Sequence, residues 1–271
     1  MSNADHVFHG SIPELYDRFM GPAFFEPYAT DLASRVRALA PAHSAALLEL
    51  AAGTGVLSRA LARSLPPEIS ILATDLNQPM LDYAARVSDP RILFRQADAL
   101  HLPFPNHSFD FVLCQFGVMF FPDKLAAYRE VRRVLKPAGR FFFSVWDRLD
   151  ANELSLAVAQ ALKDFFGGDP PAFISRTPFG YFDIPQIHRE LAQAAFRSSS
   201  VQTVALSSVT ASTQDLALGM IQGTPLRNEL ESREPGLLDR VTTAVAASLA
   251  SRFGPGPFHS RMQAHIFAAL P

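Results

Sequence analysis

Two kinds of segment alternate along the chain from about residue 41 to residue 147. Short runs of apolar residues, typical of buried strands, occur at 45–50, 70–74, 92–96, 110–115 and 140–146. Segments with apolar residues at the spacing of one helix face lie between several of these runs, at 56–65, 79–87 and 125–135. Strands that alternate with helices in this way predict a parallel sheet made of right-handed βαβ units.

The pattern changes after residue 147. Helical spacing recurs at 152–166, 184–196, 214–230 and 237–253, and a Pro-rich stretch at 169–178 separates the first two of these segments. Strand-like segments occur at 200–208 and 260–270, the second after the Gly-Pro-Gly-Pro break at 254–257. We expect these two late strands, separated by a helical insertion, to return to the edge of the first sheet.

Composition and charge narrow the classes of partner. The 271 residues include 24 Lys and Arg against 26 Asp and Glu, so the net charge is 24 − 26 = −2. Because nucleic-acid and anionic-membrane binding need a basic excess, we expect neither partner. The longest strongly apolar run, 111–122, is shorter than the roughly 18 residues of a membrane span, so we expect no stable membrane insertion. The N-terminal residues show no secretory signal pattern.

The chain has one cysteine, Cys114. A single cysteine permits no intrachain disulfide and fits a reducing compartment, so we expect a cytoplasmic location. Since Cys114 lies inside a predicted strand, we expect it to be a buried small hydrophobic residue.

A glycine-containing turn follows the first predicted strand. Gly53 and Gly55 stand in the segment LELAAGTG, between that strand and the next helix. Ligands of open parallel sheets bind at the carboxyl ends of the strands, and glycine lets the backbone approach them closely. The N–H groups of the following helix point to the same place. The alternative is a tight turn without a ligand.

An acidic residue follows each of the next two strands. Asp75 lies 75 − 55 = 20 residues after Gly55, and Asp98 follows the predicted strand at 92–96. An acid in the position of Asp75 can accept hydrogen bonds from both ribose hydroxyls of an adenosine cofactor, although it could instead cap the turn before Pro79. Asp98 could accept a hydrogen bond from the adenine amine. Together with the glycine turn, these acids predict an adenosine site.

The glycine spacing does not fit the dinucleotide fingerprint G-x-G-x-x-G/A. The third position holds Ser58 when the motif is started at Gly53, and Val56 when it is started at Ala51. No tyrosine of the chain is followed by the Tyr-x-x-x-Lys pattern of short-chain nicotinamide enzymes. Both observations count against a nicotinamide-dependent oxidoreductase on a Rossmann fold, which is kept as the alternative interpretation.

Four segments resemble, in order and spacing, the motifs of class I S-adenosylmethionine-dependent methyltransferases. They are LLELAAGTGVLSRAL, ATDLNQPMLDYA, QADALHLPFPNHSFDFVLCQFGVMFF and REVRRVLKPAGRFFFSVWD, over about 48–147. The group they resemble is the small-molecule, ubiquinone-methyltransferase-like type 11 group. The chain departs from its pattern at Ala51, where many members have glycine.

The resemblance implies a Rossmann-like three-layer α/β sandwich. Its sheet would have seven mostly parallel strands, with the last strand antiparallel and with helical cap insertions. We expect a single methyltransferase domain over 1–271, with the cofactor-binding core at about 41–147, the helical cap at about 148–196 and 212–256, and returning edge strands at 200–208 and 260–270.

The same resemblance implies S-adenosyl-L-methionine as cofactor and assigns residues to its parts. The methionine part would contact Glu49 and the backbone of Ala51, Gly53, Thr54 and Gly55. Asp75 would hold the ribose, and the adenine would lie against Leu76, Met80, Asp98 and Ala99. Gln115 and Phe116 would lie near the sulfonium. Tyr16 would fold over the methionine end, or alternatively pack on the cap.

The implied chemistry is an in-line displacement that carries a methyl group to a small organic acceptor. Alignment and exclusion of water do much of this work, and a base is needed only if the acceptor must lose a proton. Asp147 and His188 are candidate bases, but neither is selected, so the catalytic residue is unknown. A non-catalytic S-adenosylmethionine-binding module is a further alternative.

The remaining patterns bear on the acceptor. No grouping of histidine, cysteine and carboxylate predicts a metal. Residues 114–117 lack the Asn/Asp-Pro-Pro-aromatic motif of exocyclic-amine methyltransferases, which disfavours a nucleic-acid acceptor. The chain has 23 phenylalanines, and Phe-rich stretches such as 116–121 could line a pocket for an apolar or aromatic acceptor or fill the core. The sequence leaves the oligomeric state open.

Overall fold

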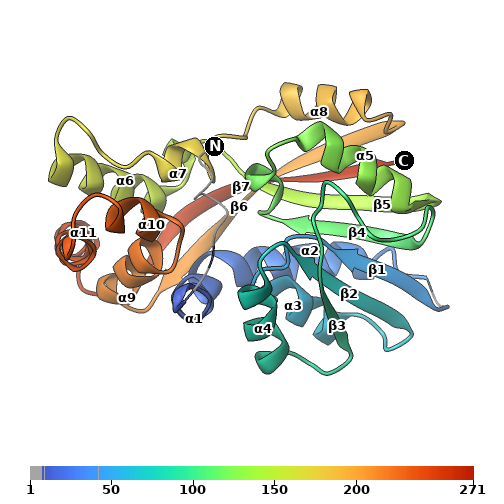
Figure 1. The fold of residues 1–271 in the computed structure, drawn as a ribbon, viewed down its shortest axis with the longest axis horizontal. Coiled ribbons are helices and arrows are strands. Elements are labelled where there is room, and N and C mark those ends of the chain that lie inside the picture. The colour runs from blue at the N-terminus through green and yellow to red at the C-terminus, as the bar shows by residue number, and fades with distance from the viewer. Residues whose placement is uncertain (1–7, 9, 42) are drawn as a thin grey trace.

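A single seven-stranded sheet organises the computed structural model, which describes residues 8, 10–41 and 43–271 (Figure 1). The strands are β1 (Ala45–Glu49), β2 (Ile69–Asp75), β3 (Ile92–Gln96), β4 (Phe109–Gln115), β5 (Leu135–Trp146), β6 (Ser198–Thr210) and β7 (Phe258–Leu270). They lie in the order β3-β2-β1-β4-β5-β7-β6. The first five pair in parallel, and β7 runs antiparallel to both β5 and β6. The predicted fold class is confirmed.

The central strands are apolar because both faces of the sheet are covered. Leu48 of β1 pairs with Leu72 of β2 on one side and with Val112 of β4 on the other. Leu48 and Val112 are fully buried. A strand buried on both faces reads as a continuous apolar run, which is why these strands were predicted from the sequence.

Two layers of helices enclose the sheet (Figure 1). One face carries α2 (Glu26–Arg37), α3 (Val56–Ser64) and α4 (Gln78–Val87), and the other carries α5 (Lys124–Val134) and α8 (Ile184–Gln193). Asp123 and Asp183 cap the latter two helices, because their carboxylates accept hydrogen bonds from backbone N–H groups of the first turn.

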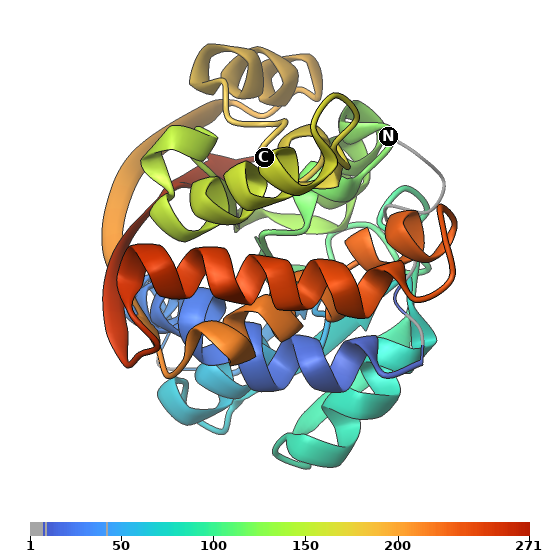
Figure 2. The same ribbon diagram turned by 90° about the vertical axis from the view of Figure 1, so that its left-hand side faces the viewer.

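The remaining helices gather at one end of the sheet, as Figures 1 and 2 show. They are α1 (Ile12–Leu15), the π-helix η1 (Tyr16–Phe25), α6 (Glu153–Phe166), α7 (Phe173–Arg176), α9 (Thr213–Ala217), the π-helix η4 (Leu218–Gln222), α10 (Leu226–Glu231) and α11 (Leu237–Phe253). Two 3₁₀ turns, η2 (Val118–Phe120) and η3 (Leu149–Ala151), follow β4 and β5. In Figure 2, α11 runs across the front of this group beside α6.

The helix expected over 214–230 is not continuous, which corrects the sequence interpretation. It is divided into α9, η4 and α10. Gly223 ends η4 where the backbone passes close to the N-terminal helices, since a Cβ on Gly223 would lie 3.0 Å from the Tyr16 nitrogen. Pro225 follows and has no N–H group to continue the helix. The Pro-rich stretch at 169–178 likewise contains a short helix, α7.

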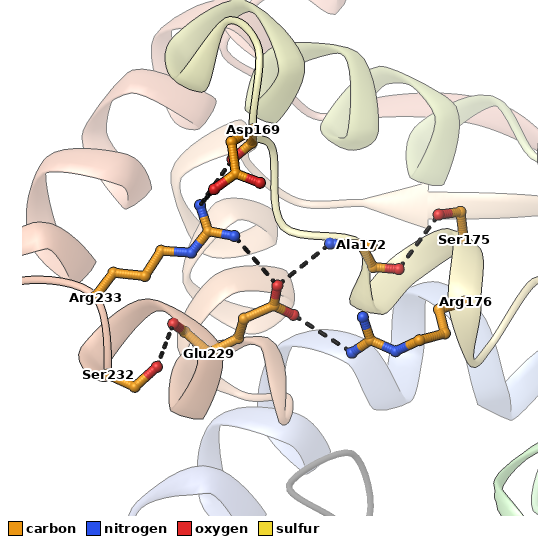
Figure 3. Close-up of polar contacts among 7 residues, drawn as sticks. All are labelled: Asp169, Ala172, Ser175, Arg176, Glu229, Ser232 and Arg233. Carbon is orange, nitrogen blue, oxygen red and sulfur yellow. Dashed lines mark hydrogen bonds and ion pairs between the residues drawn. The ribbon is translucent and has the colours of Figure 1, made fainter. Parts of the chain in front are cut away.

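A network of charged side chains joins α10 to the segment around α7 (Figure 3). The Glu229 carboxylate accepts from the Ala172 nitrogen at 3.4 Å and contacts Arg176 at 3.5 Å and Arg233 at 3.4 Å. Arg233 also donates to the Asp169 carbonyl at 2.7 Å. These contacts fix α7 against α10.

Candidate active site

A cavity of about 180 Å³ opens at the carboxyl ends of the parallel strands. This main cavity is lined by ten of the predicted site residues: Tyr16, Ala51, Gly53, Asp75, Leu76, Met80, Asp98, Ala99, Gln115 and Phe116. They come from the N-terminal π-helix, from the turns after β1, β2 and β3, from α4, and from the ends of β2 and β4. The topology brings them together because parallel strands end at the same edge of the sheet.

Asp75 is the buried acid of the main cavity, with 7% of its surface exposed. Its Oδ2 accepts a hydrogen bond from the Gly53 nitrogen at 2.9 Å, and its Oδ1 accepts from the Asn77 nitrogen at 2.8 Å. Burial raises the pKa of Asp75, although these backbone hydrogen bonds favour the ionised form and lower it. The carboxylate is thus held in place by the two turns that it joins.

The turn after β1 has three residues with left-handed backbone conformation. Ala51, Gly53 and Gly55 have φ of +51°, +56° and +81°. Ala51 is the departure from the family pattern, and its positive φ explains why glycine is common there, since a Cβ is disfavoured in this region. Gly55 lines none of the three cavities described here. A Cβ on it would instead lie 3.2 Å from Ala84 of α4.

A smaller polar cavity of about 30 Å³ lies behind the turn and is lined by Glu49, Thr54, Gln115 and Tyr16 among others. Glu49 is 1% exposed and accepts a hydrogen bond from the Ser58 hydroxyl at 2.5 Å. Burial raises the pKa of Glu49 to about 8, against the lowering effect of that hydrogen bond. Glu49 is therefore protonated at neutral pH until a cation approaches it.

Two buried polar atoms in this small polar cavity have no hydrogen-bond partner among the described residues. They are the Thr54 hydroxyl and the Gln115 Oε1, whose amide nitrogen donates to the Phe25 carbonyl at 3.2 Å. Buried polar atoms are almost always paired in folded proteins. These two atoms are therefore available to polar groups of a ligand.

A third cavity, the apolar cavity, of about 60 Å³, adjoins the main cavity. The two share Phe8, Tyr16, Phe116 and Phe120. The rest of the apolar cavity is lined from η1, η2, β5, α6, the segment around α7, and η4 with the two residues 224–225. Phe116 has a φ of +54°, and its ring stacks on that of Trp146 with centroids 3.9 Å apart. The ends of β4 and β5 thus form an aromatic floor.

Tyr16 lines all three cavities. Its ring stacks on Phe25 with centroids 4.9 Å apart, and Phe8 packs against it edge-on. Burial raises the pKa of its hydroxyl, so the phenol stays protonated at neutral pH.

The candidate bases lie outside these cavities. Asp147 contacts His265 at 3.0 Å and accepts a hydrogen bond from Gln263 at 2.6 Å. Desolvation opposes ionisation of Asp147, but these donors hold its pKa below the ordinary value. His188 makes a hydrogen bond of 2.6 Å with Ser199. Cys114 is buried, as expected.

Sequence reasoning missed several residues that line the main cavity: Phe8, Thr74, Asn77, Ala97, Leu100, Gly117, Phe120, Phe121 and Pro122. The sequence does offer a signal for Asn77. It lies two residues after Asp75 and directly before Gln-Pro, a position typical of a helix N-cap. Phe8 had none, since it reaches the cavity from a segment without periodicity.

The described part of the chain offers neither a candidate metal site nor a helix that could cross a membrane. Its His, Cys, Asp and Glu side chains form no group of three or more that could hold a metal ion. None of its helices combines the length and the apolar character that crossing a membrane requires.

Comparisons with known proteins find methyltransferases similar to part of this chain. Residues 48–143 match the family model described as a methyltransferase domain. The ubiquinone/menaquinone biosynthesis C-methyltransferase UbiE of Ralstonia pickettii is 37% identical over 136 residues, which are 47% of this chain and 56% of that protein. The chain thus spans about half the length of the curated relatives it matches. The match over 48–143 and these relatives agree with the resemblance of this segment to methyltransferases.

Solved structures support the fold. A structure described as a putative methyltransferase from an antibiotic biosynthesis pathway of Anabaena variabilis has a TM-score of 0.58 at 15% identity and covers 89% of this chain and 97% of its own. Phosphoethanolamine N-methyltransferase 2 of Haemonchus contortus, solved with S-adenosylhomocysteine, has a TM-score of 0.53 at 16% identity and covers 97% of this chain and 61% of its own.

Proposed function

We propose that the protein transfers the methyl group of S-adenosyl-L-methionine to a small organic acceptor. The observation that carries this proposal is the continuity of three sites around Tyr16: the main cavity with its buried acid Asp75, the small polar cavity with unpartnered acceptor atoms, and an apolar cavity beside both. The main cavity suits a nucleoside, the small polar cavity suits an amino-acid group, and the apolar cavity suits an apolar acceptor.

The residues present fit this cofactor. An adenosine has two vicinal ribose hydroxyls, which the Asp75 carboxylate is suited to accept, and a flat base, which Leu76 and Met80 can cover in the main cavity. The amino-acid end has an ammonium group and a carboxylate. Glu49 and the unpartnered Gln115 Oε1 are suited to the ammonium, and the Thr54 hydroxyl is suited to either group.

When bound, S-adenosyl-L-methionine supplies a methyl group already activated on a positively charged sulfur. The protein then has to align the acceptor and keep water away. Phe8, Tyr16, Phe116 and Phe120 line both of the larger cavities, so they surround the place where cofactor and acceptor would meet. We assign no general base, because none of the described residues that line the apolar cavity is Asp, Glu, Lys, Arg or His.

The alternatives are less favoured. A nicotinamide-dependent oxidoreductase would need a dinucleotide fingerprint, whereas the family model matched by 48–143 is a methyltransferase domain. A module that binds the cofactor without transferring methyl would have no use for an apolar cavity beside the cofactor site. We further propose that the protein acts in the cytoplasm, because its single cysteine is a buried free thiol.

Calorimetry tests the proposal directly. S-adenosylmethionine and S-adenosylhomocysteine should bind with one site per chain, and NADH should not compete with them. Mass spectrometry of incubations with phenols, amines and carboxylates should then detect addition of one methyl group to an acceptor. Binding of NADH without binding of either sulfur compound would refute the assignment. Cofactor binding without methylation of any acceptor would favour the non-catalytic module.

A further inference from the structure

The walls of the apolar cavity contain only three hydroxyl groups and no charged side chain among the described residues. The hydroxyls belong to Tyr16, Ser155 and Thr224. The other lining side chains are aromatic, aliphatic, thioether or proline. Because a charged molecule would find no counter-ion from these walls, the cavity selects an uncharged occupant.

The three hydroxyls differ in what they contact. The Thr224 hydroxyl is used by the backbone, since it donates to the Met220 carbonyl at 2.8 Å and accepts from the Leu226 nitrogen at 3.3 Å. The Tyr16 hydroxyl lies where the main cavity also begins. Ser155 lines the apolar cavity and neither of the other two.

Ser155 is buried and without a hydrogen-bond partner. It lies in the first turn of α6, it is 3% exposed, and its hydroxyl makes no hydrogen bond with any described residue. A serine in a helix ordinarily donates to the carbonyl of the preceding turn or points to solvent. Ser155 does neither, so its hydroxyl is available to a molecule in the cavity.

The shape of the cavity favours a planar occupant. The parallel rings of Phe116 and Trp146 form the floor, and Phe179 lies nearly parallel to Trp146 with centroids 6.0 Å apart. The free space of about 60 Å³ is too small for a fused ring system.

We propose that the apolar cavity receives the methyl acceptor, that this acceptor is an uncharged compound with one aromatic ring and a hydroxyl group remote from the methylated atom, and that Ser155 determines specificity by hydrogen-bonding that hydroxyl. The proposal rests on the proposed methyltransferase function. Ser155 is a positioning residue here, because it lies away from the main cavity and therefore from the cofactor.

The test uses Trp146 as a built-in reporter. It is the only tryptophan of the chain and lines the cavity, so its fluorescence responds to an occupant. The probes are p-cresol and p-xylene, which have nearly the same shape but differ by a hydroxyl in place of a methyl group. Both are titrated into the full chain with and without S-adenosylhomocysteine, whose own binding is followed by calorimetry.

We expect the unaltered protein to bind p-cresol more tightly than p-xylene. Ser155→Ala should weaken p-cresol binding about 3- to 10-fold and leave p-xylene unchanged or tighter, since a phenol without a partner in an apolar cavity is disfavoured. The matched control is Thr224→Val, which removes a hydroxyl from the same wall. Because that hydroxyl is engaged by the backbone, the control should keep the preference for p-cresol.

Each other outcome is decisive. If Ser155→Ala leaves the preference for p-cresol intact, or if Thr224→Val abolishes it equally, Ser155 is not the specificity residue. If neither probe changes the emission of Trp146 while S-adenosylhomocysteine binds, the cavity is not the acceptor site. If S-adenosylhomocysteine does not bind, the methyltransferase function is refuted instead. The titrations without S-adenosylhomocysteine still test whether Ser155 determines the preference for p-cresol.

Discussion

Gly117 lies so close to Ala51 that a Cβ added to Gly117 would be 2.4 Å from the Cβ of Ala51. The same added atom would lie 2.8 Å from the Cys114 sulfur. The turn after β1 and the end of β4 therefore meet so closely that residue 117 has room for a hydrogen atom but not for a Cβ. Ala51 and Gly117 both line the main cavity.

Gly117→Ala should destabilise the protein by about 2 kcal/mol, because the extra methyl group has no space. Ala51→Gly should recover part of this loss, since it removes the nearer of the two obstructing atoms. Urea unfolding of both single variants and the double variant measures their coupling energy, which should be about 1 kcal/mol or more. Additive effects would show that the two residues do not obstruct each other.

Asp75→Asn should weaken binding of S-adenosylhomocysteine roughly 30- to 100-fold. The loss corresponds to about 2–3 kcal/mol of charge-assisted hydrogen bonding to a ligand hydroxyl pair. Calorimetry is the measurement, and Asp82→Asn is the control, because the Asp82 carboxylate accepts from Gln78 on the exposed side of α4. Equal affinity of the Asp75 variant and the unaltered protein would remove Asp75 from the ribose site.

Glu49 should make cofactor binding dependent on pH. Burial raises the pKa of Glu49 to about 8 in the free protein, so at pH 7 the carboxyl is mostly protonated. A ligand ammonium group favours the carboxylate and lowers this pKa, so binding at pH 7 releases a proton. Affinity should therefore rise with pH up to about 8 and then level off.

Calorimetry in buffers of different ionisation enthalpy measures the proton released at Glu49. Glu49→Gln should abolish that release and flatten the pH dependence of affinity below pH 8. A Gln variant that releases as many protons as the unaltered protein would show that another group titrates.

Asp147→Asn should keep methyl transfer while losing stability. The Asp147 carboxylate contacts His265 and Gln263 and lines none of the three cavities, so its place is structural. Removing the charge from this mostly buried pair should cost about 2–3 kcal/mol of unfolding free energy. Thermal unfolding and turnover are measured on the same sample. A large loss of turnover with unchanged stability would restore Asp147 as a candidate base.

Glu229→Ala should act on the acceptor rather than on the cofactor. Glu229 joins Ala172 and Arg176 to α10, and the neighbouring Phe173 and Ile174 line the apolar cavity (Figure 3). Because these ion pairs are partly exposed, the loss is about 1 kcal/mol. Acceptor KM should rise several-fold, with cofactor affinity unchanged.

The control for Glu229→Ala is Glu231→Ala. Glu231 also lies in α10, but it pairs with Arg227 of the same helix, one turn away. A variant at Glu231 that raises acceptor KM to the same extent would show that the effect comes from α10 as a whole.

The lining of the main cavity was largely predictable from the sequence, and that of the apolar cavity was not. Strands β1 to β5 are short, apolar and close together in sequence, so the turns after them could be located and brought to one edge by topology alone. Ten predicted residues do line the main cavity. Gly55 does not, because the glycine motif locates the turn without saying which of its residues face the cavity.

The apolar cavity depends on contacts between distant segments. Ser155 and Phe179 belong to the segment 148–196 and meet residues of η1 and η4 there. In the sequence, Ser155 is an unremarkable serine near the start of an amphipathic helix. Only its burial without a partner distinguishes it, and that depends on packing which no local pattern encodes. The break at Gly223 arises in the same way, from the close approach of Tyr16.

The position of β7 has a consequence for the newly made chain. During synthesis β5 leaves the ribosome long before β7, its neighbour in the sheet, and β6 has no partner until β7 arrives. Meanwhile the edge of β5, with Phe141 and Phe143, is open to pairing with other strands. Truncation within 258–270 should therefore leave a nascent chain that chaperones retain, even though every residue of the main cavity has already been made.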